Sequence, residues 1–247
     1  MSDTVDAVVA RMRERLSVLE RDRDPARFFL ATYLRTTQAV ADAVDDGRFE
    51  DAPWVEWWDV VFAELYLDAL DAHRIDPKAA PRPWRIAFGA ARDAPPVLHV
   101  LLGMNAHINY DLPQSLVGVI SPTQFGDPGL IARRERDHAR IDDVLARRVS
   151  AEDGELRRVS GPRRVVDRAM TPLNRRMTTR FLRESRAKVW LNTQALHEAR
   201  VAGDDVYRRR LAELEVLSSA RVRDLTTPGP VLVRLGVRGF GVVLPPP

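Results

Sequence analysis

Apolar residues recur every three or four positions along most of the chain, a spacing that is typical of amphipathic helices. The first such run covers residues 3–19, and a second begins at Pro25 and ends near residues 45–47, Asp-Asp-Gly. Strand-like alternation is scarce. We therefore predict an all-α, bundle-like single domain over residues 1–225. Further helices are predicted at residues 54–73, 84–91, 95–112, 116–119, 130–149, 162–200 with a break at Pro172, and 204–225.

Residues 226–247 have a different character. They are rich in proline and glycine, and Arg234 and Arg238 interrupt their apolar positions. We expect an extended strap packed on the domain, or a partly disordered tail. No stretch of the chain has the roughly 20 apolar residues that a membrane-spanning helix needs. The chain begins with polar and acidic residues rather than with a basic and then an apolar segment, so we expect a cytoplasmic protein.

Charge and composition narrow the chemistry. Lysine and arginine total 38 against 35 acidic residues, so the net charge of +3 is weak evidence for nucleic-acid binding, and we expect none. The chain has no cysteine, which excludes disulfides, thiolate metal ligands and cysteine nucleophiles. Any metal must therefore be bound by histidine, carboxylate or amide oxygen. Glycine-rich phosphate loops, the Gly-x-Ser-x-Gly nucleophile motif and the zinc-protease His-Glu-x-x-His motif are all missing.

The most informative stretch is a polar insertion in the apolar helix predicted at residues 95–112. His107 and Asp111 are four residues apart, so a helix places them on one face, close enough to converge on one point. Such groups are costly to bury without partners. The pair suits a metal ion or a proton transfer, and Asn105, Asn109 and Tyr110 beside it are candidate ligand-binding residues.

A second His-x-x-x-Asp pair, His138 and Asp142, lies on the predicted 130–149 helix, and both pairs point partly inward. Asp68, at the edge of a core-facing surface, and His197, on a stripe with Trp190, are further candidates. The core-facing surface of the 54–73 helix is predicted to comprise Trp54, Trp58, Val61, Phe62, Leu65 and Ala69. A shared site would bind a divalent metal such as zinc, iron or manganese through His107, Asp111, His138 and Asp142, completed by Asp68 or His197.

Three chemistries fit these residues. In the first, a His/carboxylate metal centre activates water for hydrolysis, and the helical pairs resemble those of the zinc-dependent phospholipase C and single-strand nuclease group. The further ligand histidine of that group is missing from residues 112–115, Leu-Pro-Gln-Ser. The second is a ferritin-like dinuclear site, which needs two Glu-x-x-His motifs, and only Glu135 to His138 fits one.

The third chemistry needs no metal. Asp111 would orient His107 for acid–base work, and the carboxamides of Asn105 and Asn109 would bind a polar ligand. The leading hypothesis is a metal-dependent hydrolase-like site on the buried helix. The alternative is a non-enzymatic helical domain whose His-Asp pairs are structural or line a pocket for an unidentified small molecule.

The run Met-Asn-Ala-His-Ile-Asn-Tyr-Asp-Leu-Pro at residues 104–113 is the most specific motif of the chain. It is accompanied upstream by Phe62-Ala63 with Tyr66-Leu67 and by Trp84 before Ala87-Phe88, and downstream by Asp137 with Ile141-Asp142 and Val144-Leu145. Together they resemble an uncharacterised, mainly actinobacterial family of domains of unknown function over about residues 25–199. The resemblance implies an all-helical domain and supplies no assigned activity and no catalytic residues.

Overall fold

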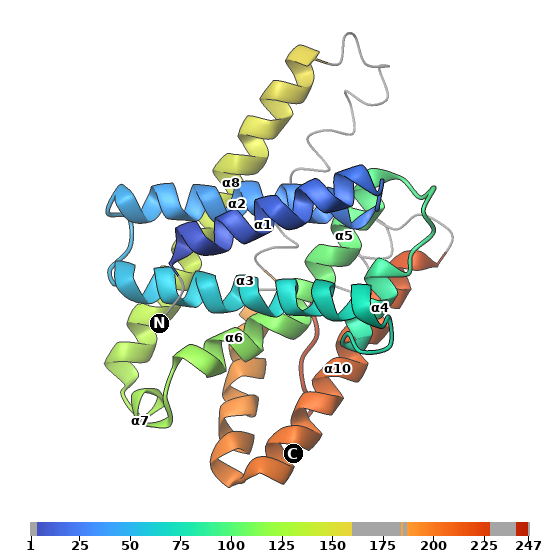
Figure 1. The fold of residues 1–247 in the computed structure, drawn as a ribbon. Helices are drawn as coiled ribbons and strands as arrows, with labels where there is room; N and C mark the ends of the chain where they lie inside the picture. The colour runs from blue at the N-terminus through green and yellow to red at the C-terminus, as the bar shows by residue number, and fades with distance from the viewer. Residues whose placement is uncertain (1–3, 160–183, 185–186, 228–240, 247) are drawn as a thin grey trace.

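The computed structural model describes residues 4–159, 184, 187–227 and 241–246 (Figure 1). Within these ranges the regular structure is helical throughout and contains no strand, which confirms the all-α prediction. The elements are α1 (Val5–Arg21), α2 (Ala26–Asp45), α3 (Ala52–Ile75), α4 (Arg82–Phe88), α5 (Pro96–Ala106), the π-helix η1 (His107–Asp111), α6 (Leu112–Val119), α7 (Pro122–Phe125), α8 (Pro128–Val159), a helical segment at residues 187–202, and α10 (Asp204–Thr226).

The predicted helices 95–112 and 116–119 are joined in the structure. The chain passes through η1 into α6, which includes Pro113, without leaving a helical path. The predicted start of α3 at Trp54 is two residues late, because the side chain of Asp51 caps the helix by accepting a hydrogen bond from the Trp54 amide at 3.2 Å. The predicted break at Pro172 lies outside the described residues.

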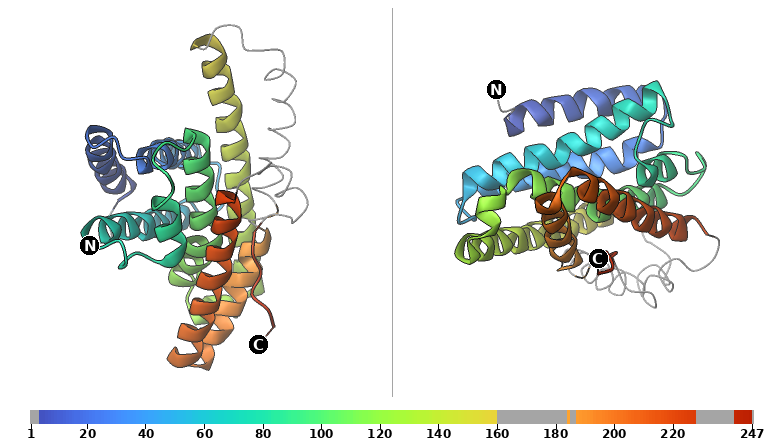
Figure 2. Two further views of the ribbon diagram at one scale, coloured as in Figure 1. Left: turned by 90° about the vertical axis from the view of Figure 1, so that its right-hand side faces the viewer. Right: turned by 90° about the horizontal axis from the view of Figure 1, so that it is seen from below.

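Helices α1, α2 and α3 all contact one another, with α1 in front of α2 and α3, and we call this group the three-helix layer (Figures 1 and 2). The α5–η1–α6 run crosses behind this layer, where α5 contacts α2 and α6 contacts α3. On its other side, α10 contacts α5 and η1, and it forms a hairpin with the 187–202 helix (Figure 2). The π-helix therefore lies between the three-helix layer and the hairpin.

A glycine fixes how closely α5 approaches α2. A Cβ atom at Gly103 would lie 2.4 Å from Cγ of Phe29, well inside van der Waals contact. Any larger residue would push the two helices apart or displace the ring. Because His107 is one turn further along, this close approach also brings its imidazole against the α2 aromatics.

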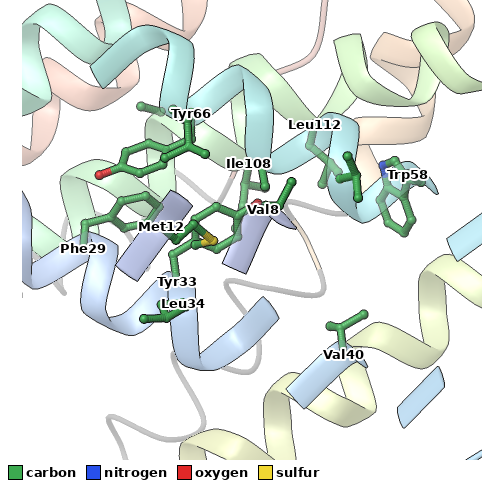
Figure 3. Packing of buried hydrophobic residues seen from close by; sticks show 14 of the residues in the cluster. Val8, Met12, Phe29, Tyr33, Leu34, Val40, Trp58, Tyr66, Ile108 and Leu112 are labelled. Atoms are coloured by element: carbon green, nitrogen blue, oxygen red, sulfur yellow. The ribbon is translucent and has the colours of Figure 1, made fainter. Parts of the chain in front are cut away.

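Two apolar clusters stabilise the fold. The larger lies within and behind the three-helix layer, and Figure 3 shows Met12, Phe29, Tyr33 and Tyr66 packed together in it. The smaller cluster includes Leu244 of the 241–246 segment, and its other buried members are Tyr110, Val117, Leu196 and Leu214. None of the described helices combines the length and the apolarity that crossing a bilayer requires.

Candidate functional site

The structure brings His107 and Asp111 together, as their spacing predicts. His107 Nδ1 lies 2.8 Å from Asp111 Oδ2, and the two side chains are 4% and 3% exposed. The same carboxylate oxygen accepts a hydrogen bond from the indole nitrogen of Trp84 at 2.9 Å. An ionised carboxylate can only accept hydrogen bonds, so opposite ionised Asp111 the Nδ1 of the neutral imidazole carries the proton and donates it. We call these two residues the dyad.

The dyad spans a π-helical turn, His107–Asp111, and Pro113 explains it. In an α-helix the ring of Pro113 would clash with the carbonyl four residues earlier, and the missing N–H would break one hydrogen bond. A wider turn, in which the Leu112 amide bonds to the His107 carbonyl, relieves this conflict. The Gln114 side chain donates to the Tyr110 carbonyl at 2.7 Å. Single π-turns inside α-helices are frequent at functional sites.

Aromatic rings enclose His107. Its imidazole stacks on Phe62 with ring centroids 3.6 Å apart and an interplanar angle of 5°, and the ring of Tyr33 meets it edge-on at 4.5 Å. The rings of Phe29, Trp84 and Tyr66 follow at 5.9, 5.9 and 6.1 Å. Helices α2, α3 and α4 thus each contribute rings to one box around the imidazole, which η1 carries.

This apolar box sets the protonation of the dyad. Burial lowers the pKa of His107, although its hydrogen bond to Asp111 and the carboxylate charge oppose the effect. The imidazole is therefore neutral at pH 7. Burial raises the pKa of Asp111, and the hydrogen bonds from His107 and Trp84 counter that rise. Burial also raises the pKa of Tyr33 and Tyr66 far above the usual range of a phenol.

Several buried polar atoms around the box have no hydrogen-bond partner among the residues that the structure describes. They are Nε2 of His107, the phenol oxygens of Tyr33 and Tyr66, Oγ1 of Thr37 and Oδ2 of Asp59. The Thr37 hydroxyl is close enough to Tyr33 to oppose part of the rise in its pKa, but the two do not reach hydrogen-bonding geometry. Unpaired buried polar atoms are rare in folded proteins, and a group of them is typical of a site that receives water or a ligand.

Sequence reasoning missed Asp59, one turn before Phe62 on α3. The residue is 8% exposed, and burial raises the pKa of its carboxyl to about 7. Its charge in turn raises the pKa of Tyr33, so the two side chains belong to the same polar neighbourhood. The predicted core-facing surface of α3 left Asp59 out because it assumed a single buried face. The helix is covered by α1 and α2 on one side and by α6 on another.

The second predicted pair is arranged differently. His138 is buried, and its ring lies 5.3 Å from Trp58 and 5.6 Å from Trp190. Trp58 stacks on Phe62, and Phe62 also stacks on His107, so the two imidazoles contact different rings of one stacked series. The side chain of Asp142 lies outside the described residues.

The carboxylate with a clear role near His138 is its neighbour Asp137, which is fully buried. Its two oxygens accept hydrogen bonds from the backbone amides of Glu50 and Asp51 at 2.8 and 2.9 Å, and Arg140 donates to it at 2.8 Å. Asp137 therefore holds the α2–α3 loop against α8. This role is structural, and the sequence motif that contains Asp137 gave no sign of it.

The other candidates are dispersed. Asp68 is exposed on α3 rather than at a core edge, and His197 stacks on Phe125 at 3.9 Å rather than on Trp190, with its Nδ1 3.1 Å from Arg200. Phe125 is the last residue of α7, the short helix that Ser121 caps, and its ring contacts the 187–202 helix at His197. Among the described side chains, no three from histidine, aspartate and glutamate come together as a metal site would require.

The two carboxamides of the motif are used within the protein. Asn105 donates to the Leu101 carbonyl at 2.8 Å. Asn109 donates to the Asn105 carbonyl at 2.9 Å and accepts from the Val242 amide at 3.1 Å. Tyr110 packs in the smaller apolar cluster. Asn109 and Tyr110 thus face the 241–246 segment and not the imidazole.

A model of a family of unknown function, DUF5995, matches residues 5–228. The chain belongs to this family. The match is longer than the stretch expected from the sequence motif, and it contains the dyad, the aromatic box and Asp59 but not the 241–246 segment. No curated protein and no solved structure matches the chain. Family membership therefore assigns no activity, and the functional argument rests on the geometry of the site.

Proposed function

We propose that the chain binds a small polar molecule at the dyad, with Nε2 of His107 as the acceptor of a hydrogen bond or proton from the ligand. One observation carries this proposal. Nε2 is buried and has no partner in the described part of the chain, while Nδ1 of the same ring is fixed by a carboxylate. A buried acceptor without a donor is costly, and an incoming N–H or O–H group removes that cost.

The arrangement has the features of an oriented base. A carboxylate that holds Nδ1–H fixes the tautomer and the plane of the ring, and it leaves the Nε2 lone pair free to accept a proton, as in the histidine of hydrolase triads. Trp84 fixes the carboxylate in turn. The lowered pKa of His107 keeps the lone pair available at pH 7. These features support either binding alone or binding with proton transfer.

The walls of the box indicate which ligands fit. Phe62 and Tyr33 cover the ring with apolar surface, whereas the phenol oxygen of Tyr33, which has no hydrogen-bond partner among the described residues, offers a polar group. A small, mainly flat molecule with one N–H or O–H donor suits such a box. Because the dyad is almost completely buried, a ligand reaches it only when the surrounding helices move apart.

The geometry alters the metal hypothesis. Asp111 faces Nδ1, so it would act as the outer partner that orients a ligand histidine, and Nε2 would be the metal-binding atom. A hydrolytic centre built this way needs two or more further ligands. Asp68 and His197, expected to complete the site, lie elsewhere in the fold, and the box around His107 is aromatic. A polar organic ligand therefore has more support than a metal.

The test is a ligand-observed NMR screen of the full-length protein against small neutral molecules with one N–H or O–H donor, such as phenols, amides and azoles. We expect binders whose affinity falls at least about 10-fold in His107→Phe, which keeps the aromatic packing and removes the acceptor. The control His197→Phe should bind like the wild type. If His107→Phe bound these molecules as tightly as His197→Phe and the wild type do, the role of Nε2 would be refuted. Elemental analysis of chelator-free protein separates the alternatives, because stoichiometric metal lost in His107→Phe would support the metal centre.

A further inference from the structure

The 241–246 segment is bound to the helices through its backbone. The buried side chain of Asn192 donates to the Val242 carbonyl at 2.9 Å and accepts from the Leu244 amide at 2.8 Å. A carboxamide has one donor and one acceptor side, as a peptide group has, so Asn192 takes the place of a neighbouring strand. Figure 2 shows the segment running beside the 187–202 helix.

Two further side chains contact the same backbone. Oδ1 of Asn109 accepts from the Val242 amide at 3.1 Å, and Arg210 donates to the Pro245 carbonyl at 2.7 Å. Three side chains from three helical elements therefore bind the main chain at Val242, Leu244 and Pro245. Hydrogen bonds to backbone groups recognise an extended conformation rather than particular side chains.

The side chain of the segment that is most deeply buried is Leu244, and it provides most of the selectivity. Leu244 is 6% exposed within the smaller apolar cluster, whereas Val243 before it is 43% exposed. Val242, on the other side of Val243, is partly buried against the same cluster, so the segment alternates as an extended strand with Leu244 and Val242 on its inward side. Pro245 favours an extended conformation of the residue before it, and its missing N–H costs nothing here because Arg210 bonds only its carbonyl.

We propose that the groove formed by Asn109, Asn192, Arg210 and the Leu244 pocket is a recognition site for an extended peptide that carries leucine followed by proline. In this chain the 241–246 segment occupies the groove as a tethered ligand, and an untethered peptide of the same kind displaces it. The proposal does not depend on the ligand proposed for the dyad. Tethering raises the local concentration of a segment to about the millimolar range, so the groove of the wild-type chain is mostly filled.

The experiment uses full-length protein and a fluorescein-labelled, capped peptide Gly-Val-Val-Leu-Pro-Pro, with binding measured by fluorescence anisotropy. Leu244→Asp should release the tethered segment and bind the peptide at least about 10-fold more tightly than the wild type. Val243→Asp is the matched control, because its side chain points to solvent, and it should behave like the wild type. A peptide with aspartate in place of leucine should not bind. Equal binding by Leu244→Asp and the wild type would overturn the proposal.

A measurement on the unmodified chain covers the case in which Leu244→Asp fails to fold. In the wild type, millimolar unlabelled peptide should accelerate hydrogen exchange of the Leu244 amide, because displacement removes its bond to Asn192. The peptide with aspartate should leave the exchange unchanged. Exchange that stays unchanged with the leucine peptide would mean that the segment is a fixed part of the fold and not a displaceable ligand.

Discussion

Asp59 provides a quantitative test of the buried polar neighbourhood around the dyad. In the unfolded chain an aspartate has a pKa of about 3.9, whereas burial raises the pKa of Asp59 to about 7. The folded protein therefore binds more protons than the unfolded chain between these two values, and its stability must fall as pH rises through that window. A gap of about three pH units corresponds to a loss of about 4 kcal/mol in the free energy of unfolding.

The substitution Asp59→Asn keeps the size of the side chain and removes its charge. We expect the variant to match the wild type near pH 4 and to exceed its stability by up to about 4 kcal/mol above pH 7, with most of the difference arising between pH 4 and 7. Urea denaturation at a series of pH values measures this. Asp68→Asn, exposed on the same helix, is the matched control and should stay within about 0.5 kcal/mol of the wild type. A difference between Asp59→Asn and the wild type that does not vary with pH would refute the reasoning.

Three further substitutions test how the site is held. Gly103→Ala should lower the free energy of unfolding, measured by thermal denaturation, by about 1–3 kcal/mol, because the added Cβ overlaps the Phe29 ring. The control Gly118→Ala, whose Cβ would make only an ordinary contact at 3.9 Å, should be neutral or stabilising. Equal effects of the two substitutions would contradict the close approach of α5 to α2. Trp84→Phe removes a donor to Asp111 and should lower the free energy of unfolding in urea by about 1–3 kcal/mol, so an unchanged value would count against that bond. Asp137→Ala removes the acceptor of the Glu50 and Asp51 amides, so it should lower the free energy of unfolding by about 3–5 kcal/mol and accelerate hydrogen exchange of both amides. Amides that stay protected in the variant would exclude the proposed anchoring role.

The features that could be predicted from the sequence are those that depend on neighbours along the chain. Periodicity located α1 and α2, because an amphipathic helix repeats its apolar face at a fixed spacing. The contact between His107 and Asp111 could be predicted for the same reason, since residues four apart meet on any helix. Even the widening of the helix to a π-turn did not separate them.

The features that could not be predicted depend on residues brought together by the fold. Phe62 and Tyr33 enclose His107 only because α2 and α3 pack against η1, and neither carries a local signal of that role. Asp59 looked like an ordinary polar position because nothing in its helix shows that two sides are covered. Asn109 pairs with Val242, a contact 133 residues apart along the chain.

The His138 pair shows why spacing alone misleads. His-x-x-x-Asp predicts that two side chains can meet, but not that they share a purpose with another such pair. Here the buried ring of His138 contacts two tryptophans. Its immediate neighbour Asp137, which was not a candidate, is the carboxylate that the fold uses. Two similar motifs have different surroundings, and the surroundings decide the chemistry.

The π-helix connects the two proposed binding sites, because successive residues of one turn project in different directions. His107 and Asp111 face the aromatic box, whereas Asn109, between them, faces the 241–246 segment. A substitution at Asn109 therefore removes a contact to the peptide groove and also disturbs the turn that orients the dyad. Asn192 and Arg210 contact the same segment from other helices, so their variants isolate the groove, as His107→Phe isolates the box. Ligand binding at the dyad that changes in Asn192→Ala would mean that the two sites are coupled through this turn.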